Sequence, residues 1–115
     1  MYYSIGAGKL TIFSDIQRET VAHEASYPDK SHAGNALVEY VQNAARMAGS
    51  WVVIRTARDG SSGCWDLCDS AEDAHGVANA PHPVTAPGVI IGPDGTAYHM
   101  PRATLDRFLD MVRRA

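Results

Sequence analysis

The sequence predicts one α+β domain over residues 1–115, with a mixed β-sheet of four to six strands and about three helices packed on it. The length of 115 residues is near the most common size of a single domain. Short β-branched and aromatic runs alternate with longer stretches of helical period. No repeat, linker or low-complexity tract divides the chain. The expected order is strand, strand, helix, strand, helix, strand, strand, helix.

The N-terminal segment is expected to form a β-hairpin. Residues 2–5 and 9–13 are rich in apolar and aromatic side chains, as strands are. Between them, the glycines of Gly6-Ala7-Gly8 suit a turn that needs positive φ. Residues 19–23 are a candidate for a third strand.

The clearest helix begins after the break at Tyr27-Pro28-Asp29, with Ser31 as its expected N-cap and Gly49 as the residue that ends it. Its apolar stripe has helical spacing and consists of Ala33, Ala36, Leu37, Tyr40, Val41, Ala44 and either Met47 or Ala48. Residues 51–56 follow as a β-branched and aromatic run. Such a run is typical of a strand buried on both faces.

A second helix is expected over residues 64–79, after a loop at 59–63. In this interpretation Cys64, Cys68 and His75 lie on one stripe of the helix. Three aspartates of the same segment lie on another stripe.

The C-terminal third is expected to form a hairpin and a last helix. Residues 88–91 and 96–99 flank Gly92-Pro93-Asp94-Gly95, where proline presets φ and a glycine takes the left-handed position. The last helix is expected to open at Pro101. Its buried stripe would be Leu105, Phe108, Leu109 and Val112.

The charge balance limits the classes of partner that the chain is expected to bind. It has 10 Lys and Arg against 13 Asp and Glu, a net charge of −3. A nucleic acid or an anionic membrane is therefore not the expected partner, because both attract basic surfaces. The first residues do not resemble a signal peptide, and no apolar run is long enough to span a membrane. We expect a soluble cytoplasmic protein whose partner is another protein, with its oligomeric state left open.

Two cysteines and two histidines are candidate ligands of a zinc ion. On a helix Cys64 and Cys68 would face the same way, and His75 would return to nearly the same face. His32, at the start of the first long helix, would supply a further ligand. The alternative is that both cysteines are small core residues that need no metal. The expected cofactor is therefore either none or zinc.

The order of the elements resembles the cytidine-deaminase-like zinc fold. In that fold a helix bearing His-x-Glu precedes a strand and a helix opened by Cys-x-x-Cys. The corresponding segments here are His32-Ala33-Gly34 and residues 64–68. Gly34 stands in place of the general acid–base glutamate, and three residues instead of two separate the cysteines. The resemblance therefore implies either no deamination or a different base, such as Glu24 or Glu39.

Cys64 is also a candidate nucleophile, because it follows a glycine-bearing loop and a helix N-terminus lowers the pKa of a thiol. Its base would be a histidine such as His32, His75 or His82.

The candidate interaction surface is a tryptophan beside an acidic row. Trp65 lies off the cysteine stripe of the expected helix, where an exposed tryptophan would suit a protein interface. Asp66, Asp69 and Asp73 form the row beside it and would attract a basic partner.

No candidate completes a catalytic motif, so the sequence does not decide whether the protein is an enzyme. The favoured hypothesis is a small binding module of regulatory, immunity or phage accessory type, since residue usage suggests a bacterial or phage genome. The alternative is a small zinc-dependent hydrolase, or a degenerate member of the deaminase-like zinc fold, that uses Cys64, Cys68 and a histidine.

Overall fold

The structure is a computed structural model that describes residues 1–81, 83–99 and 102–114. Its strands are β1 (Tyr2–Gly6), β2 (Lys9–Phe13), β3 (Val21–Ser26), β4 (Trp51–Ala57), β5 (Ser62–Cys68), β6 (Thr85–Ile91) and β7 (Ala97–Tyr98). Its helices are α1 (Lys30–Ala48), α2 (Ala71–Asn79) and α3 (Leu105–Arg114).

The described strands form a single sheet of seven in the order β3-β2-β1-β5-β4-β6-β7, and every neighbouring pair is antiparallel. The α+β class and the three helices are confirmed. The expected four to six strands and the expected mixed sheet are wrong. The expected order of elements lacked β5, and it left out the candidate strand at residues 19–23, which overlaps the observed β3.

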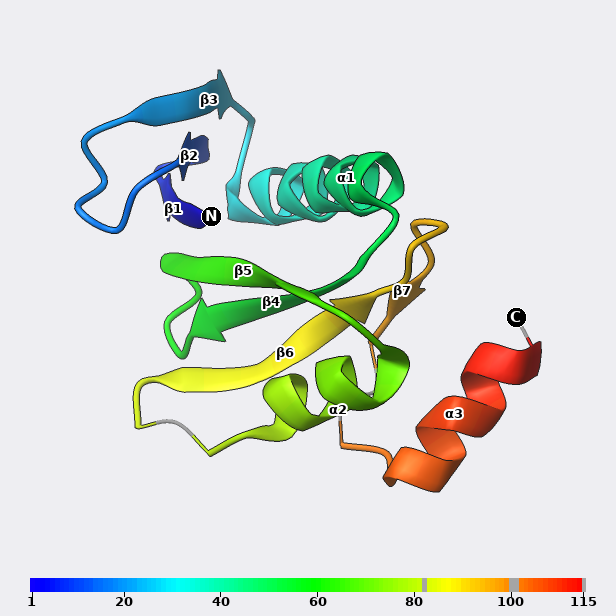
Figure 1. The fold of residues 1–115 in the computed structure, drawn as a ribbon. Coiled ribbons are helices and arrows are strands. Elements are labelled where there is room, and N and C mark those ends of the chain that lie inside the picture. Colours follow the sequence, from blue (N-terminus) through cyan, green and yellow to red (C-terminus); the bar gives the residue numbers. More distant parts are fainter. Residues whose placement is uncertain (82, 100–101, 115) are drawn as a thin grey trace.

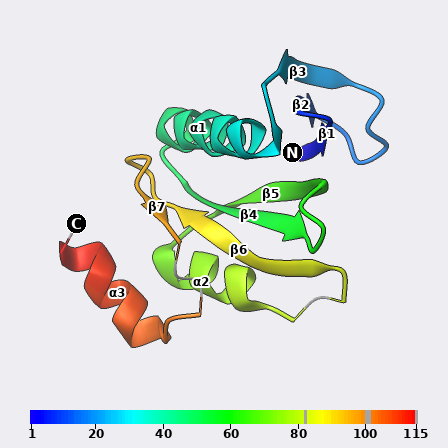
Figure 2. The ribbon, with the colours of Figure 1, turned by 180° about the vertical axis from the view of Figure 1, so that it is seen from behind.

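The helices lie on both faces of the sheet (Figure 1). α1 packs on one face, while α2 lies beneath β4 and β6 on the other, with α3 beside it (Figures 1 and 2). The central strand β4 contributes to both layers. Its Val52 and Ile54 belong to the core under α1, and its Val53 belongs to the core under α2. The prediction of a strand buried on both faces is therefore confirmed.

The N-terminal hairpin and α1 follow local signals. Ala7 and Gly8, which join β1 to β2, have φ of 52° and 78°, as a tight hairpin turn with two left-handed residues requires. The helix begins two residues earlier than the expected Ser31 cap. Asp29 is the N-cap, and its carboxylate accepts a hydrogen bond from the His32 amide. Gly49 ends the helix with φ of 63°, as predicted.

The helix expected over residues 64–79 is wrong in its first half, because Ser62–Cys68 is strand β5. The turn that precedes it contains Asp59-Gly60, and Gly60 has φ of 73°. This dipeptide joins β4 and β5 into a hairpin, which is the structure that Asp-Gly favours between two strands. The helix itself starts at Ala71, with Ser70 as an N-cap that accepts from the Asp73 amide.

The hairpin of β6 and β7 is confirmed, with Ile90 opposite Tyr98. α3 starts at Leu105, and the Arg107 amide donates to the Thr104 hydroxyl before it. The expected opening of this helix at Pro101 falls on a residue outside the described ranges. Among the described helices, none combines the length and apolar character that crossing a membrane requires.

Candidate functional site

The two cysteines lie on one strand rather than on one helix. Because side chains alternate along a strand, Cys64 and Cys68 both point toward the face that α2 covers. Four residues of strand span about 13 Å. Two thiolates on one zinc ion, at about 2.3 Å each, lie within about 5 Å of each other. The argument that Cys64 and Cys68 bind one metal ion assumed a helix, so it does not apply to two cysteines this far apart on a strand.

The candidate histidine ligands have other partners. His32 is exposed at the start of α1, and its Nδ1 lies 2.9 Å from Asp29 Oδ1. His75 Nε2 lies 2.6 Å from the carbonyl oxygen of Ala103, and its ring centroid lies 5.6 Å from that of Phe108. Within the described ranges no three His, Cys, Asp or Glu side chains are grouped to hold a metal ion. The candidate base His82 lies outside the described residues.

Trp65 does not form part of an exposed surface, contrary to the expectation from sequence. It is only 4% exposed and packs beneath α1, with its ring centroid 6.0 Å from that of Tyr40. The residue lies on β5 opposite Ile54, on the α1 face of the sheet. Because residues 62–68 form a strand instead of the expected helix, the Trp65 side chain lies in the core.

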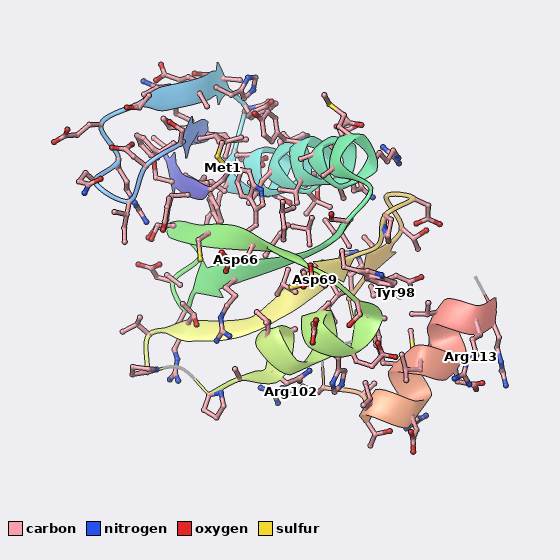
Figure 3. All side chains as sticks on the ribbon, viewed as in Figure 1. Met1, Asp66, Asp69, Tyr98, Arg102 and Arg113 are labelled. Atoms are coloured by element: carbon pink, nitrogen blue, oxygen red, sulfur yellow. The ribbon has the colours of Figure 1, made fainter. Side chains whose placement is uncertain are left out.

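The three candidate aspartates do gather, and we name Asp66, Asp69 and Asp73 the acidic edge. All three are exposed, and they lie on β5, after its end and in the first turn of α2. Asp66 and Asp69 are labelled in Figure 3. Burial, followed by the charges of these three carboxylates, raises the pKa of the Cys68 thiol. One cysteine thus feels all three charges.

An apolar row crosses the sheet next to the acidic edge. Its members are Val21 on β3, Phe13 on β2, Tyr2 on β1 and Cys64 on β5, and each lies directly opposite the next. The alternate residues of β1 and β2, such as Tyr3 and Ile12, pack under α1. The apolar row therefore lies on the opposite face.

No described helix covers this part of the sheet. α2 lies beneath β4 and β6 with α3 beside it, and both helices are away from β1, β2 and β3 (Figures 1 and 2). Val21 is 50% exposed, while Tyr2, Phe13 and Cys64 are half-buried. Along β5, Asp66 follows Cys64 on the same face of the strand. The apolar row and the acidic edge thus form one continuous surface.

The loop between β2 and β3 extends this surface. The Asp15 carboxylate accepts hydrogen bonds from the amides of Glu19 and Thr20, at 3.1 and 2.9 Å. Arg18 takes the left-handed conformation, with φ of 60°. Ile16, three residues after Phe13, is 67% exposed at the tip. A folded loop thus presents a further large apolar side chain.

The acidic edge has no cationic partner within the described residues, where the ion pairs involve Glu24, Asp29 and Asp110 instead. Carboxylates beside an apolar strip can bind a partner with a basic flank. Near Cys64 the charges are mixed, because the N-terminal ammonium, Arg55 and Arg18 act on its thiol as well as Asp66. Burial and the Asp66 carboxylate raise the pKa of the Cys64 thiol, which keeps it protonated at neutral pH. The surface is therefore suited to recognition.

Sequence reasoning found the acidic edge and missed the apolar row. The signal was present in the N-terminal hairpin. With Tyr3 and Ile5 assigned to the core, alternation assigns Tyr2 to the other face, and the turn then sets Phe13 opposite it. The pairing with Val21 and Cys64 depends on β3, for which residues 19–23 were only a candidate, and on β5, which was expected to be helical.

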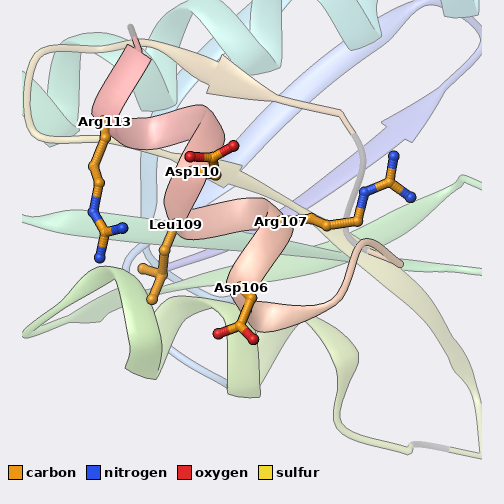
Figure 4. Close-up of a pocket in the computed structure, with 5 residues that line it drawn as sticks. All are labelled: Asp106, Arg107, Leu109, Asp110 and Arg113. Atoms are coloured by element: carbon orange, nitrogen blue, oxygen red, sulfur yellow. The ribbon is translucent and has the colours of Figure 1, made fainter.

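A hollow on α3 does not extend this surface. Its lining consists of Asp106, Arg107, Leu109, Asp110 and Arg113, which all come from one helix (Figure 4). Four of the five side chains are exposed, and Asp110 forms an ion pair with Arg114. The hollow is an indentation in the outer surface of the helix.

Comparison with models of protein families, with curated proteins and with solved structures found no match to this chain.

Proposed function

We propose that the protein is a binding module that recognises another protein through the open face of its sheet. The observation that carries the proposal is the apolar row across β3, β2, β1 and β5 beside the acidic edge. Aromatic side chains at the centre of a polar surface are typical of protein interfaces.

The neighbouring rows of the same face show why this row is distinctive. In the next row of this face, two residues along each strand, Thr11 and Ser4 lie opposite each other. Beyond them Lys9 of β2 forms an ion pair with Glu24 of β3. These are ordinary solvated residues of a sheet with one wet face. The large apolar side chains are confined to one end of the face, next to the aspartates.

The charges define the partner. Apolar side chains on the partner would cover Tyr2 and Phe13, and lysine or arginine beside them would face the acidic edge. Such opposite charges increase association rates and select partners more than they add affinity. The partner expected is therefore a protein segment with an apolar centre and a basic flank.

A zinc-dependent hydrolase was the alternative from sequence. No geometry in the described residues favours it, so it stays a prediction that metal analysis tests. The interaction proposal instead accounts for Asp66, Asp69 and Asp73, which sequence singled out, and for the uncovered face that structure adds.

The proposal is tested by selecting binders from a library of displayed random peptides against the wild-type protein. The enriched peptides should combine aromatic or aliphatic residues with Lys or Arg. Phe13→Ser should weaken their binding at least tenfold, because the centre of an interface contributes most of the energy. Replacing all three aspartates of the acidic edge with asparagine should lower affinity and reduce its salt dependence.

Met47→Ser is the matched control, because Met47 is 90% exposed on α1, away from this face. It should leave the binding of the peptides unchanged. Peptides that bind Phe13→Ser as tightly as the wild type, or an enriched pool without basic residues, would contradict the proposal.

A further inference from the structure

A second region with the features of a binding site is a pocket between α1 and the sheet, on the face opposite to the apolar row. Its volume is about 170 Å³. Its apolar walls are Tyr3, Ile5, Leu37, Val38, Ile54 and Val89. A buried apolar cavity of about 150 Å³ is large enough to hold benzene. The pocket can therefore hold one small ring or a branched chain of similar size.

A glycine of α1 keeps the pocket open. Gly34 lines it from the second turn of the helix. Glycine in a helix interior costs about 1 kcal/mol relative to alanine. A Cβ at this position would meet no atom within 4 Å, so no close approach requires glycine here. Because Gly34 lines the pocket, a large side chain at residue 34 would extend into its space.

Two hydrogen-bonding groups lie at the pocket. Tyr3 Oη donates to Thr56 Oγ1 at 2.8 Å, which leaves the hydroxyl proton of Thr56 free to donate. At the mouth, Lys30 Nζ donates to the Asp59 carbonyl and lies 3.0 Å from the position of a Cβ at Gly60. The ammonium has two further donors. The polar groups of the lining thus favour an acceptor.

Lys30 is the one cation among the described residues that line the pocket, and its charge contributes, after the hydrogen bonds from Ser61, to the lowered pKa of the Asp59 carboxyl. The nearby Asp59 carboxylate is held by the Ser61 amide and hydroxyl, at 2.9 and 2.7 Å. The Asp29 carboxylate is likewise held, as the N-cap of α1, by the His32 amide. Both carboxylates stay ionised but have their hydrogen bonds within their own turns, and the Lys30 ammonium forms no direct ion pair with either of them, so its remaining donors can reach a ligand.

We propose that this pocket binds a small monocarboxylate with an apolar body of about the size of benzene. The body lies between α1 and the sheet, and the carboxylate faces the Lys30 ammonium. The site is separate from the open face of the sheet, so it provides a small-ligand function in addition to protein binding.

The test is a titration of the ¹⁵N-labelled protein with benzoate, followed by NMR. Benzyl alcohol, which has a similar body without charge, is the second probe. Benzoate should shift the amides of Gly34, Gly60 and Val89 in a saturable way, with a Kd on the order of 1 mM for so small a ligand. Benzyl alcohol should bind more weakly.

Three variants separate the two parts of the proposal. Gly34→Leu should abolish the saturable shifts by filling the pocket, whereas Gly76→Leu, the same change at an open helical position of α2, should keep them. Lys30→Gln should weaken benzoate binding about fivefold and leave benzyl alcohol unchanged.

Saturable benzoate shifts that persist in Gly34→Leu, or a wild type that shows none, would overturn the site. Equal affinity for the two probes, unaffected by Lys30→Gln, would overturn the assignment of a carboxylate. Urea unfolding of each variant establishes that a lost signal is not lost folding.

Discussion

Gly34 and Gly49 both belong to α1, and at the scale of single residues they illustrate opposite uses of glycine. Gly49 ends the helix with φ of 63°, a conformation that other residues adopt at a cost. Gly34 lies within the helix, with open space where its Cβ would be. Only at Gly49 does the backbone conformation favour glycine over other residues.

Gly34→Ala should therefore raise the free energy of unfolding by about 1 kcal/mol, because alanine is the better helix former. Gly49→Ala should lower it by about 1 kcal/mol, because it places a Cβ in the left-handed region. Urea unfolding of both variants measures the two changes. Shifts in the same direction would contradict this account of the helix.

Cys64 and Cys68 give a second prediction at this scale. Zinc binds the thiolate, and burial with the neighbouring carboxylates raises the pKa of both thiols. Together with their separation along β5, this predicts well below one zinc ion per chain in protein purified without added metal. The Cys64→Ser, Cys68→Ser double variant should have the same metal content. One zinc per chain, lost in the double variant, would favour the hydrolase alternative instead.

Among single elements, α2 depends on one arginine of β4. The Arg55 guanidinium donates to the carbonyls of Val77 and Ala80, at 2.6 and 3.0 Å, and to the Thr85 hydroxyl at 2.9 Å. It thereby caps the C-terminus of the helix and joins it to β6. A cation at this end of a helix also complements the helix dipole.

Arg55→Leu should lower the free energy of unfolding by about 2 kcal/mol, since charge-assisted hydrogen bonds are lost and carbonyls are left without a partner. Hydrogen exchange should increase most at the last turn of α2. Arg55→Lys should restore only part of the loss, because one ammonium cannot span the same acceptors. The neighbouring exposed Arg58→Leu is the control and should change stability by under about 0.5 kcal/mol. An equal effect of Arg55→Leu and Arg58→Leu would rule out the cap.

β5 shows why an element of this kind escapes sequence reasoning. Cys64 and Cys68 are four residues apart, a spacing that fits one face of a helix and equally one face of a strand. The Asp59-Gly60 turn favours the strand, but the pairing partners of β5 are β1 and β4. The paired residues of β1 and β5 are 58 to 62 positions apart in sequence, so no local pattern predicts this pairing.

For the whole molecule, the tyrosine and cysteine side chains that are partly or fully buried make the free energy of unfolding depend on pH. Burial is the main cause that raises the pKa of Tyr3, Tyr98, Cys64 and Cys68 above their ordinary values of 10.0 and 9.0. As pH rises, the unfolded chain releases these protons before the folded protein does. Their contribution to stability is complete below the unfolded pKa values and is lost as pH rises through the folded ones.

Three aspartates act in the opposite direction. Hydrogen bonds from the amides of His32, Ser61 and Thr96 lower the pKa of Asp29, Asp59 and Asp94 below 3.8. Their contribution is present above the unfolded pKa and is lost as pH falls through the folded one. Because these carboxylates are exposed, solvent screening makes the acidic loss the smaller one.

The expected result is a free energy of unfolding that is highest near neutral pH and falls more steeply above about pH 9 than below about pH 4. Urea unfolding from about pH 3 to about pH 11 measures it. Tyr3→Phe should flatten the alkaline side. Stability that rises from neutral to alkaline pH would contradict the direction of these pKa shifts.

The sequence by itself determined the features that neighbouring residues encode. The glycine turn and alternation gave the hairpin of β1 and β2, the helical stripe gave α1, and proline with Asp-Gly gave the turn between β6 and β7. It also located the acidic edge, because the aspartates can be identified in the sequence whatever secondary structure they adopt.

Only the tertiary structure decided which strands meet and which faces stay uncovered. The apolar row takes one residue from each of four strands, and its membership follows from registers set by distant pairings. The pocket likewise requires α1 to lie across β1, β4 and β6. Both sites depend on contacts between residues far apart in sequence, and the burial of Trp65 depends on them too.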